Sequence, residues 1–303
     1  MTAEGRYNTP DAARTAITDK LRAEAAKGPW KLSDLQRQYA YDQLVERLYR
    51  VDADWVIKGA TALLARRVSV RHTVDIDVYR AGAITEVERR MRAAAALDIG
   101  DWMTFEVGPR SMTIQAAGAQ GARVKVTSLI GTKIWAPFQI DMVAEGIEMT
   151  GIPDAVPPLT DVEILDQDRA HWQAYPLVDH VADKVCAILE RHNGHPSTRF
   201  KDLIDLVAIT MRCTVPASLQ MEALAKEATR RNLLLPTKFD VPDRTIWTAG
   251  YSAEARRTVG LTAITLDDAL AVVRPFLDPL LEGVAADNWD PRNQAWRTGS
   301  PSA

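Results

Sequence analysis

Residues 74–78 constrain the fold more than any other segment, because they alternate apolar and acidic residues as Val-Asp-Ile-Asp-Val. Alternation with a period of two is typical of a β-strand that buries one face. The apolar side chains would face a core, and the carboxylates of Asp75 and Asp77 would lie side by side on the other face. Two adjacent anions repel each other, and a divalent cation is the natural group to offset them. The pair therefore predicts a metal site on a sheet.

A glycine-containing turn precedes this strand, in the sequence Lys58-Gly59-Ala60-Thr61. The short apolar run 55–57 leads into the turn, and a short helix is expected over 61–67. Glycine allows a backbone to approach a ligand closely. A glycine turn beside an aspartate pair is therefore typical of a nucleoside triphosphate site.

A second acidic strand is expected over residues 138–143, which read Phe-Gln-Ile-Asp-Met-Val. The apolar residues share one face, and Asp141 lies on the other. On a neighbouring strand, Asp141 could complete the metal site or act as a base for the incoming nucleophile. A solvated aspartate on a sheet face is the alternative interpretation.

The first half of the chain mixes helices and strands. Helices are expected over 11–27, 33–50 and 84–97. Strands of one mixed or antiparallel sheet are expected over 103–107, 111–115, 122–130 and 137–143. The segment 151–160 is rich in proline and glycine, which indicates a domain boundary.

The second half is helical by pattern, with helices expected over 160–166, 178–192, 200–212, 217–231 and 265–282. The domain prediction is an α/β domain with N-terminal helices over 1–155, a helical domain over 156–283 and a flexible tail over 284–303, which Trp289 and Trp296 could anchor. A division of this kind favours a site between the two domains.

The helix expected over 178–192 carries an apolar stripe and an opposite stripe that includes Lys184 and Arg191. These two cations lie seven residues apart, so they would project from the same helix face. Together they could bind a triphosphate. The alternative interpretation is an ordinary solvated face.

A loop with Gly194 and Pro196 follows, flanked by His192 and His195, and the next helix carries Asp202 and Asp205 at i, i+3 spacing. The cysteines, Cys186 and Cys213, match no zinc motif and are interpreted as buried reduced thiols. The two histidines are interpreted as solvated loop residues.

The chain has 303 residues, a net charge of −3 and no globally basic character. An RNA partner would therefore need a local basic path. Candidates for that path are Arg66, Arg67, Arg71, Arg230 and Arg231. No apolar run is long enough to span a bilayer and the N-terminus lacks a signal-peptide pattern, so a cytoplasmic location without a membrane partner is expected.

Four motifs in this order resemble the AbiEii family of nucleotidyltransferase-like toxins, which includes the mycobacterial MenT toxins. The motifs are Lys58-Gly-Ala-Thr-Ala-Leu, Arg71-His-Thr-Val-Asp75-Ile-Asp77, Asp183-Lys184 with Arg191, and Arg199-Phe-Lys-Asp202-Leu-Ile-Asp205-Leu. The resemblance extends from about residue 35 to 215. It implies an α+β fold class: a polymerase β-like nucleotidyltransferase core, which is a mixed sheet with helices, followed by an all-helical domain.

The resemblance also assigns roles. Asp75 and Asp77 would be catalytic and hold Mg²⁺ or Mn²⁺, and Lys184 would meet the phosphates of the NTP substrate. Asp202 would be the acid of the last motif, with Asp205 as an alternative. The nucleotide-binding residues would be Lys58, Gly59, Thr61 and Arg191. The chain departs from the family at Ala60, where a second glycine is usual, and the methyl group there restricts the backbone.

Such toxins are the catalytic half of toxin–antitoxin pairs, and some transfer nucleotides from an NTP to the 3′ acceptor end of tRNA, which halts translation. The resemblance thus predicts a nucleotidyltransferase with tRNA and a cognate antitoxin as partners. From the Asp75/Asp77 pair we expect it to use two-metal phosphoryl transfer. Three alternatives stay open. The acceptor could be a small molecule or a protein, the Asp pair could serve a glycosyltransferase, or the fold could bind RNA or a protein without catalysis.

Overall fold

The computed structural model describes residues 7–68, 71–116, 119–162 and 171–297. Its contacts divide the chain into two compact units, which are described separately. The first unit comprises residues 1–66, 72–147 and 153–174, and the second comprises 67–71, 148–152 and 175–303, apart from the residues outside the described ranges.

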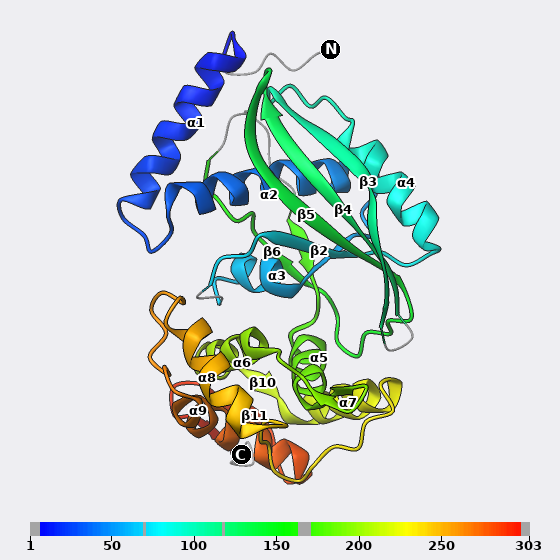
Figure 1. The fold of residues 1–303 in the computed structure, drawn as a ribbon, viewed down its shortest axis with the longest axis vertical. Helices are drawn as coiled ribbons and strands as arrows, with labels where there is room; N and C mark the ends of the chain where they lie inside the picture. The colour runs from blue at the N-terminus through cyan, green and yellow to red at the C-terminus, as the bar shows by residue number, and fades with distance from the viewer. Residues whose placement is uncertain (1–6, 69–70, 117–118, 163–170, 298–303) are drawn as a thin grey trace, which may run out of the picture. The chain divides into compact units, whose positions relative to one another are not determined.

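The first unit contains a seven-stranded mixed sheet with the order β3-β4-β5-β2-β1-β7-β6 (Figure 1). Its strands are β1 (Val56–Lys58), β2 (Asp75–Tyr79), β3 (Met103–Ala116), β4 (Ala119–Ile130), β5 (Lys133–Glu145), β6 (Asp154–Val156) and β7 (Trp172–Ala174). The long strands β3, β4 and β5 are antiparallel neighbours, and β2 joins β5 in parallel. The short strand β1 pairs antiparallel with β2 and parallel with β7.

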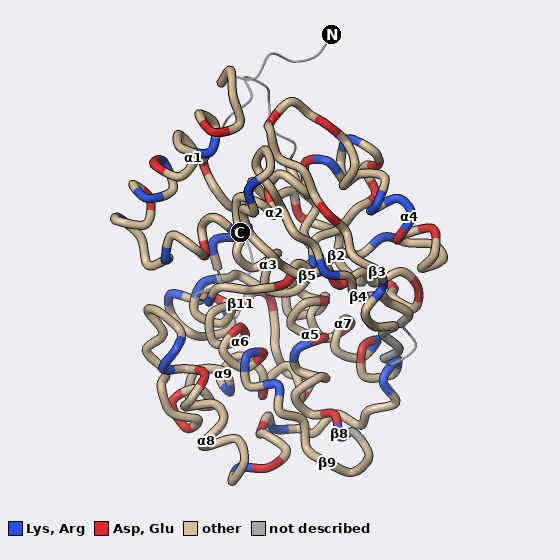
Figure 2. Tube along the Cα trace, turned by 45° about the horizontal axis from the view of Figure 1, so that its top comes forward, with Lys and Arg blue, Asp and Glu red and all other residues tan. Residues whose placement is uncertain are grey.

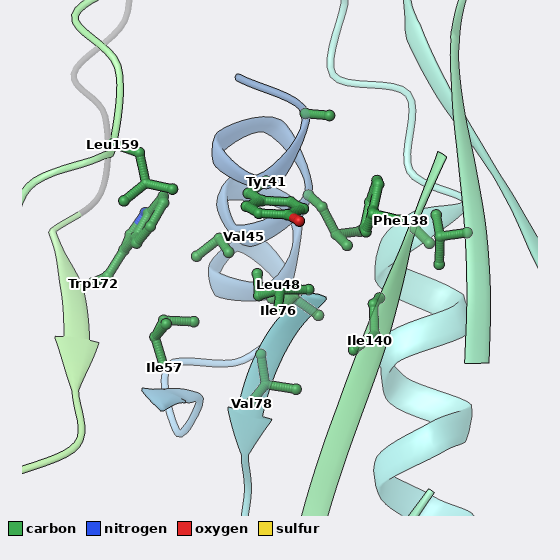
Figure 3. Packing of buried hydrophobic residues seen from close by; sticks show 14 of the residues in the cluster. Tyr41, Val45, Leu48, Ile57, Ile76, Val78, Phe138, Ile140, Leu159 and Trp172 are labelled. Carbon is green, nitrogen blue, oxygen red and sulfur yellow. The ribbon is translucent and has the colours of Figure 1, made fainter. Parts of the chain in front are cut away.

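The helices of the first unit are α1 (Pro10–Ala25), α2 (Leu32–Val51), α3 (Gly59–Ala65) and α4 (Ile84–Ala95). The core forms where α2 packs on the sheet, and Figure 3 shows Tyr41, Val45 and Leu48 of α2 with side chains of the central strands. In β2, Ile76 and Val78 are fully buried. Because alternate residues of a strand face opposite ways, this core leaves the acidic residues of β2 on the other face.

Val74 was expected to face the core, but the strand begins one residue later, at Asp75, and Val74 is 50 % exposed. The expected alternation of the second acidic strand is confirmed, since Phe138, Ile140 and Met142 are all buried. The apolar period therefore placed both strands on the correct face.

The second unit is mainly helical, with α5 (Leu177–Leu189), α6 (Phe200–Arg212), α7 (Ala217–Arg230), α8 (Arg244–Ala255) and α9 (Leu266–Leu281). A hairpin joins α5 to α6 and consists of β8 (Arg191–His192) and β9 (His195–Pro196). A small antiparallel sheet consists of β10 (Val215–Pro216), β11 (Asn288–Asp290) and β12 (Ala295–Trp296). The expected α+β organisation, a mixed sheet with helices followed by a helical unit, is confirmed.

The division between the units lies later than the expected boundary at residue 155. Strands β6 and β7 extend the first sheet beyond β1, so residues 153–174 belong to the first unit. Of the helix expected over 160–166, residues 160–162 are not helical and the rest lies outside the described residues. The expected flexible tail is folded as far as Arg297, because Trp289 of β11 is fully buried. No helix in the described ranges is both long and apolar enough to cross a membrane.

Candidate active site

The first unit brings four charged residues into one row across its sheet. Asp77 of β2 is the register partner of Asp141 on β5 and of Lys58 on β1. Arg123 of β4 is in turn the register partner of Asp141. We call this sequence, Lys58–Asp77–Asp141–Arg123, the charged row. Two anions lie in its centre with a cation at each end, so the sheet itself supplies part of the charge that the aspartates require.

Gly59 lies directly against the carboxylate of Asp77. It is the first residue of α3 and has a φ of 58°, a left-handed conformation that favours glycine. A Cβ atom at this position would lie 1.8 Å from Oδ2 and 2.7 Å from Cγ of Asp77. The glycine that was predicted to bind the nucleotide thus also makes room for a carboxylate of the site.

Two threonines fix Asp75, which is partly exposed on β2. The hydroxyl of Thr73 donates to Oδ1 of Asp75 at 2.9 Å and to its carbonyl oxygen at 3.0 Å. The hydroxyl of Thr61 donates to the same carbonyl at 3.3 Å, and Thr61 is fully buried. Thr61 was predicted to bind the nucleotide, but its hydroxyl is directed at the protein backbone. Ala60 is only 4 % exposed, so its methyl group also faces the interior.

Asp141 is paired with Arg123 through both of its oxygens. The guanidinium donates from Nε to Oδ1 at 2.6 Å and from a second nitrogen to Oδ2. The hydrogen bond to Asp141 raises the pKa of Arg123 above its ordinary value, and the charges of Asp141, Asp75 and Asp77 act in the same direction. Arg123 therefore lies within the electrostatic reach of all three carboxylates.

Asp141 was expected to complete a metal site. Within the described ranges, no group of three or more His, Cys, Asp or Glu side chains is arranged to hold a metal ion. The carboxylate of Asp141, the predicted third ligand, is instead paired with Arg123. Arg123 is not evident from the sequence, since its relation to Asp141 depends on the pairing of β4 with β5.

The second unit contains a separate cluster of opposite charges around Lys184 of α5. Its ammonium group donates to Oδ1 of Asp202 at 2.9 Å and to Oδ2 of Asp205 at 2.7 Å, both on α6. Arg71 donates to both oxygens of Asp205, at 2.9 and 2.7 Å. The structure thus brings together three of the predicted site residues, and it adds Arg71 to them.

Burial and charge act against each other in this cluster. The side chains of Lys184 and Asp205 are 4 % and 1 % exposed. Burial alone would raise the pKa of Asp205, but the charges of Lys184 and Arg71 and the hydrogen bonds from both hold it well below its usual range. Burial alone would lower the pKa of Lys184, and the charges of Asp202 and Asp205 raise it above its ordinary value instead. Both partners are therefore ionised at neutral pH.

Arg191 does not share a helix face with Lys184, so that prediction is wrong. Helix α5 ends at Leu189, and Arg191 lies in the β8–β9 hairpin. Its guanidinium donates to the carbonyl oxygens of Pro242 at 2.9 Å and of Gly194 at 3.4 Å.

Most of the arginines expected to form a basic path lie in ion pairs. Arg66 pairs with Asp154, and Arg71 pairs with Asp205. Arg230 and Arg231 both pair with Glu227, and Arg231 also contacts Asp183 and Glu190. Figure 2 shows cationic and anionic residues interspersed along each unit. The expected path is therefore balanced by acidic neighbours within the same unit.

The two cysteines and the two loop histidines can be compared with their interpretation from the sequence. Cys186 is buried, Cys213 is partly exposed, and neither forms a disulfide. Burial raises the pKa of Cys186 to about 12, which keeps this thiol protonated. His195 is exposed as expected, and the side chain of His192 lies outside the described residues.

Comparisons with known proteins bear on the family and the fold of this chain. A family profile described as "Nucleotidyl transferase AbiEii toxin, Type IV TA system" matches residues 43–272, which is more than half of the chain. The structure is similar to that of MenT4, a nucleotidyltransferase toxin from Mycobacterium tuberculosis H37Rv, with a TM-score of 0.51 and 13 % sequence identity, over 88 % of this chain and 98 % of that one.

The structure of JHP933 from Helicobacter pylori gives a TM-score of 0.46 and 13 % identity, over 83 % of this chain and 91 % of that one. A search of curated protein sequences finds no match. At 13 % identity the similarity to MenT4 indicates a shared fold, whereas the family profile identifies the class of enzyme.

Proposed function

The chain belongs to the AbiEii family of nucleotidyltransferase toxins of type IV toxin–antitoxin systems, and we propose that it transfers nucleotides from an NTP to the 3′ acceptor end of tRNA. The family establishes the nucleotidyltransferase class. The tRNA acceptor, the two-metal mechanism and the inhibition of translation and growth are our proposal. It follows that a cognate antitoxin is the natural protein partner, and that the enzyme acts in the cytoplasm.

The single observation that carries the proposal is the arrangement around Asp77. Its carboxylate lies against Gly59, next to Asp75 on the same strand face and to Asp141 on the neighbouring strand. Residue 59 must be glycine because a Cβ atom there would collide with the carboxylate of Asp77. The carboxylates lie on the face of β2 and β5 opposite the packed core. The aspartate pair and the glycine turn thus form one local unit, as a nucleotidyl-transfer site requires.

The donor set of this face suits Mg²⁺ or Mn²⁺, because carboxylate oxygens are the ligands that these ions prefer. We propose that Asp75 and Asp77 hold the metal, with Asp141 as a third ligand or as a base. When bound, a divalent metal would offset the triphosphate charge and favour ionisation of the attacking hydroxyl. Thr73 and Thr61 would act beforehand by fixing the orientation of Asp75.

In the second unit, we propose Lys184 as the residue that contacts the nucleotide phosphates, on the basis of its motif. Asp205 would position Lys184, since it is buried and binds both Lys184 and Arg71. Asp202 is the more exposed of the two acids and the better candidate for the essential acid of its motif. Lys58 and Arg191 are proposed as further nucleotide contacts by resemblance alone.

The proposal can be tested by incubating the protein with each labelled NTP, Mg²⁺ and total tRNA, and resolving the products on a denaturing gel. Wild-type protein should label RNA of tRNA length with at least one NTP. Asp77→Ala should abolish the labelling, because it removes a carboxylate from the centre of the charged row. A matched control is Asp54→Ala, whose carboxylate belongs to the same unit and is 78 % exposed.

Failure of the wild type to label RNA under any NTP would overturn the tRNA proposal. Equal labelling by wild type and Asp77→Ala would overturn the metal assignment. Loss of labelling in Asp54→Ala as well would show that the assay reports folding instead of chemistry, and circular dichroism of each variant separates these cases.

A second candidate acceptor is a small molecule or a protein, and one observation favours it. Arg66, Arg71, Arg230 and Arg231 are engaged by acidic side chains, and the chain has a net charge of −3. An acceptor without a phosphate backbone would not need a basic path. Label that enters a small product or a protein band, with none in RNA, would select this alternative.

A further inference from the structure

Arg123 has no place among the expected catalytic residues, yet it contacts both oxygens of one carboxylate of this face. It lies on β4 beside Asp141, and its guanidinium occupies both oxygens of that carboxylate. The side chain of Asp141 is largely buried, so it has little water to offset its charge. A bidentate arginine is the strongest single partner that a buried carboxylate can have from a side chain.

The charged row explains why a cation is needed at this position. Asp77 and Asp141 are adjacent across β2 and β5, and like charges so placed destabilise each other. A buried carboxylate that loses its partner is strongly unfavourable. Arg123 therefore performs, for Asp141, the charge compensation that a divalent cation could also perform.

We propose that Arg123 is an internal counter-cation which competes with a divalent metal ion for Asp141. This inference rests on the proposed function, because it assumes that Asp75 and Asp77 bind the metal. Arg123 is a positioning residue in this view. It holds Asp141 in place until a metal ion takes over one or both carboxylate oxygens, and the guanidinium then moves away.

The position of Arg123 permits such an exchange. Its side chain is 32 % exposed, whereas that of Asp141 is 11 % exposed. The guanidinium can therefore leave toward water without being buried elsewhere. A metal ion can use Asp141 only in the molecules in which Arg123 has released it. The apparent metal affinity is therefore the intrinsic affinity multiplied by the fraction of molecules with Asp141 unpaired.

The experiment measures the dissociation constant of Mn²⁺ by titration calorimetry, with electron paramagnetic resonance of free Mn²⁺ as a second measurement. The full chain is first stripped of metal with EDTA. Arg123→Gln should bind Mn²⁺ more tightly than wild type, by roughly fivefold or more, which is the lower range of typical coupling between two binding events. Arg123→Lys retains a charge but loses the bidentate geometry, so a smaller gain is expected.

Loss of a positive charge could raise the affinity simply through the electrostatic field of the protein, and two controls separate this effect. Arg110→Gln removes a guanidinium from the same unit. That group is 31 % exposed and donates from two nitrogens to Glu88, at 2.8 and 2.6 Å. It should leave the dissociation constant unchanged. In the background of Asp141→Asn, Arg123→Gln should produce no gain, because the contested carboxylate is absent.

A gain of equal size with and without Asp141 would overturn the competition, and so would an unchanged or weaker affinity in folded Arg123→Gln. If Arg123→Gln does not fold, the same measurements on Arg123→Lys decide the question. An equal gain in affinity with and without Asp141, or no gain at all, would overturn the competition. Asp77→Asn distinguishes failure of the proposed function. Should wild-type binding of Mn²⁺ be absent, or be insensitive to Asp77→Asn, the metal assignment fails together with this inference. Binding that depends on Asp77 but gives no gain in the Arg123 variants refutes this inference alone.

Discussion

A side chain at residue 59 and the carboxylate of Asp77 cannot occupy the same space, since a Cβ atom there would lie 1.8 Å from Oδ2 of Asp77. Gly59 also has a left-handed φ of 58°. Both requirements are met only by glycine, the first for space and the second for backbone conformation. The turn and the aspartate pair thus depend on each other, although they are 18 residues apart in the sequence.

Gly59→Ala should therefore impair nucleotidyl transfer more than it impairs folding. The new methyl group must displace the carboxylate of Asp77 or shift the start of α3. A displacement of about 1 Å in a reacting group can cost on the order of 100-fold in rate. We expect a loss of this size in labelled product and a weaker response of the melting temperature to Mn²⁺.

Gly260→Ala is the matched control. Gly260 has a φ of 75°, and nothing lies within 4 Å of the Cβ position. It shares the backbone cost of a left-handed residue, roughly 1–2 kcal/mol, without a steric conflict. If both variants lose the same stability and neither loses activity, the contact between residue 59 and Asp77 has no role in the reaction.

The alternation of apolar and acidic residues was sufficient to place Asp75, Asp77 and Asp141 on the correct sheet face. Once the apolar residues of a strand face the core, the residues between them must face the other way. The alternation was not sufficient to find Arg123. Strand β4 was predicted in nearly its true extent, but which of its residues meets Asp141 depends on the register with β5. Register is set by contacts between strands, and a single sequence does not display it.

The prediction for Arg191 failed for a different reason. An ideal helix over 178–192 aligns Lys184 with Arg191, but α5 ends at Leu189 and the cap residue Glu190 is extended. Helix ends are the least defined part of a periodic pattern, because the final turn has few backbone partners. One turn of error was enough to remove Arg191 from the helix face. Strands β6 and β7 were missed since three residues are too few to show a period.

Asp205→Asn should destabilise the second unit. Lys184 would keep the carboxylate of Asp202 only, and Arg71 would lose the carboxylate of Asp205. The loss of one partner from a buried ion pair typically costs about 3–5 kcal/mol. Asp202→Asn should cost less, since Asp202 is more exposed and its second contact, with Arg199, is longer at 3.5 Å. Urea unfolding at pH 7 measures both. Equal costs would contradict the view that Asp205 is the structural anchor.

The ion pairs of Asp205 should also make the free energy of unfolding depend on pH. The pKa of Asp205 is lower in the folded protein than in an unfolded chain, where it is about 3.9. The folded state then binds this proton more weakly, so the contribution is fully present above the unfolded pKa and is lost as the pH falls toward the folded value. The stability difference between wild type and Asp205→Asn should therefore be constant from pH 7 to about 5 and shrink below about pH 4. A difference independent of pH in that acid range would contradict the pairing.

Arg47 should be essential for the stability of the first unit. Its side chain and that of Asp101 are both fully buried and joined by two hydrogen bonds, at 2.7 and 2.9 Å. The guanidinium also donates to the carbonyl oxygens of Gln43, Leu97 and Met103, which ties α2 to the start of β3. Arg47→Ala should cost about 3–5 kcal/mol in urea unfolding.

The matched control for Arg47 is Arg22→Ala. Arg22 pairs with Asp19 on α1, and both side chains are more than 60 % exposed. An exposed pair of this kind contributes under about 1 kcal/mol. Comparable losses in the two variants would show that burial of the Arg47–Asp101 pair does not determine its contribution.

Trp289 tests whether the C-terminal segment is part of the fold. Its indole is fully buried, stacks edge-to-face on Phe276 of α9 and donates a hydrogen bond to the carbonyl oxygen of Thr210 at 2.8 Å. Removal of a buried tryptophan side chain typically costs about 3–5 kcal/mol. Trp289→Ala should lower the free energy of unfolding by this amount, whereas Val284→Ala, at a position that is 68 % exposed, should change it little. A flexible tail, as the sequence alone suggested, would make both variants neutral. A loss of unfolding free energy in Trp289→Ala, with little change in Val284→Ala, is expected if β11 is part of the small sheet and packs against Phe276 of α9.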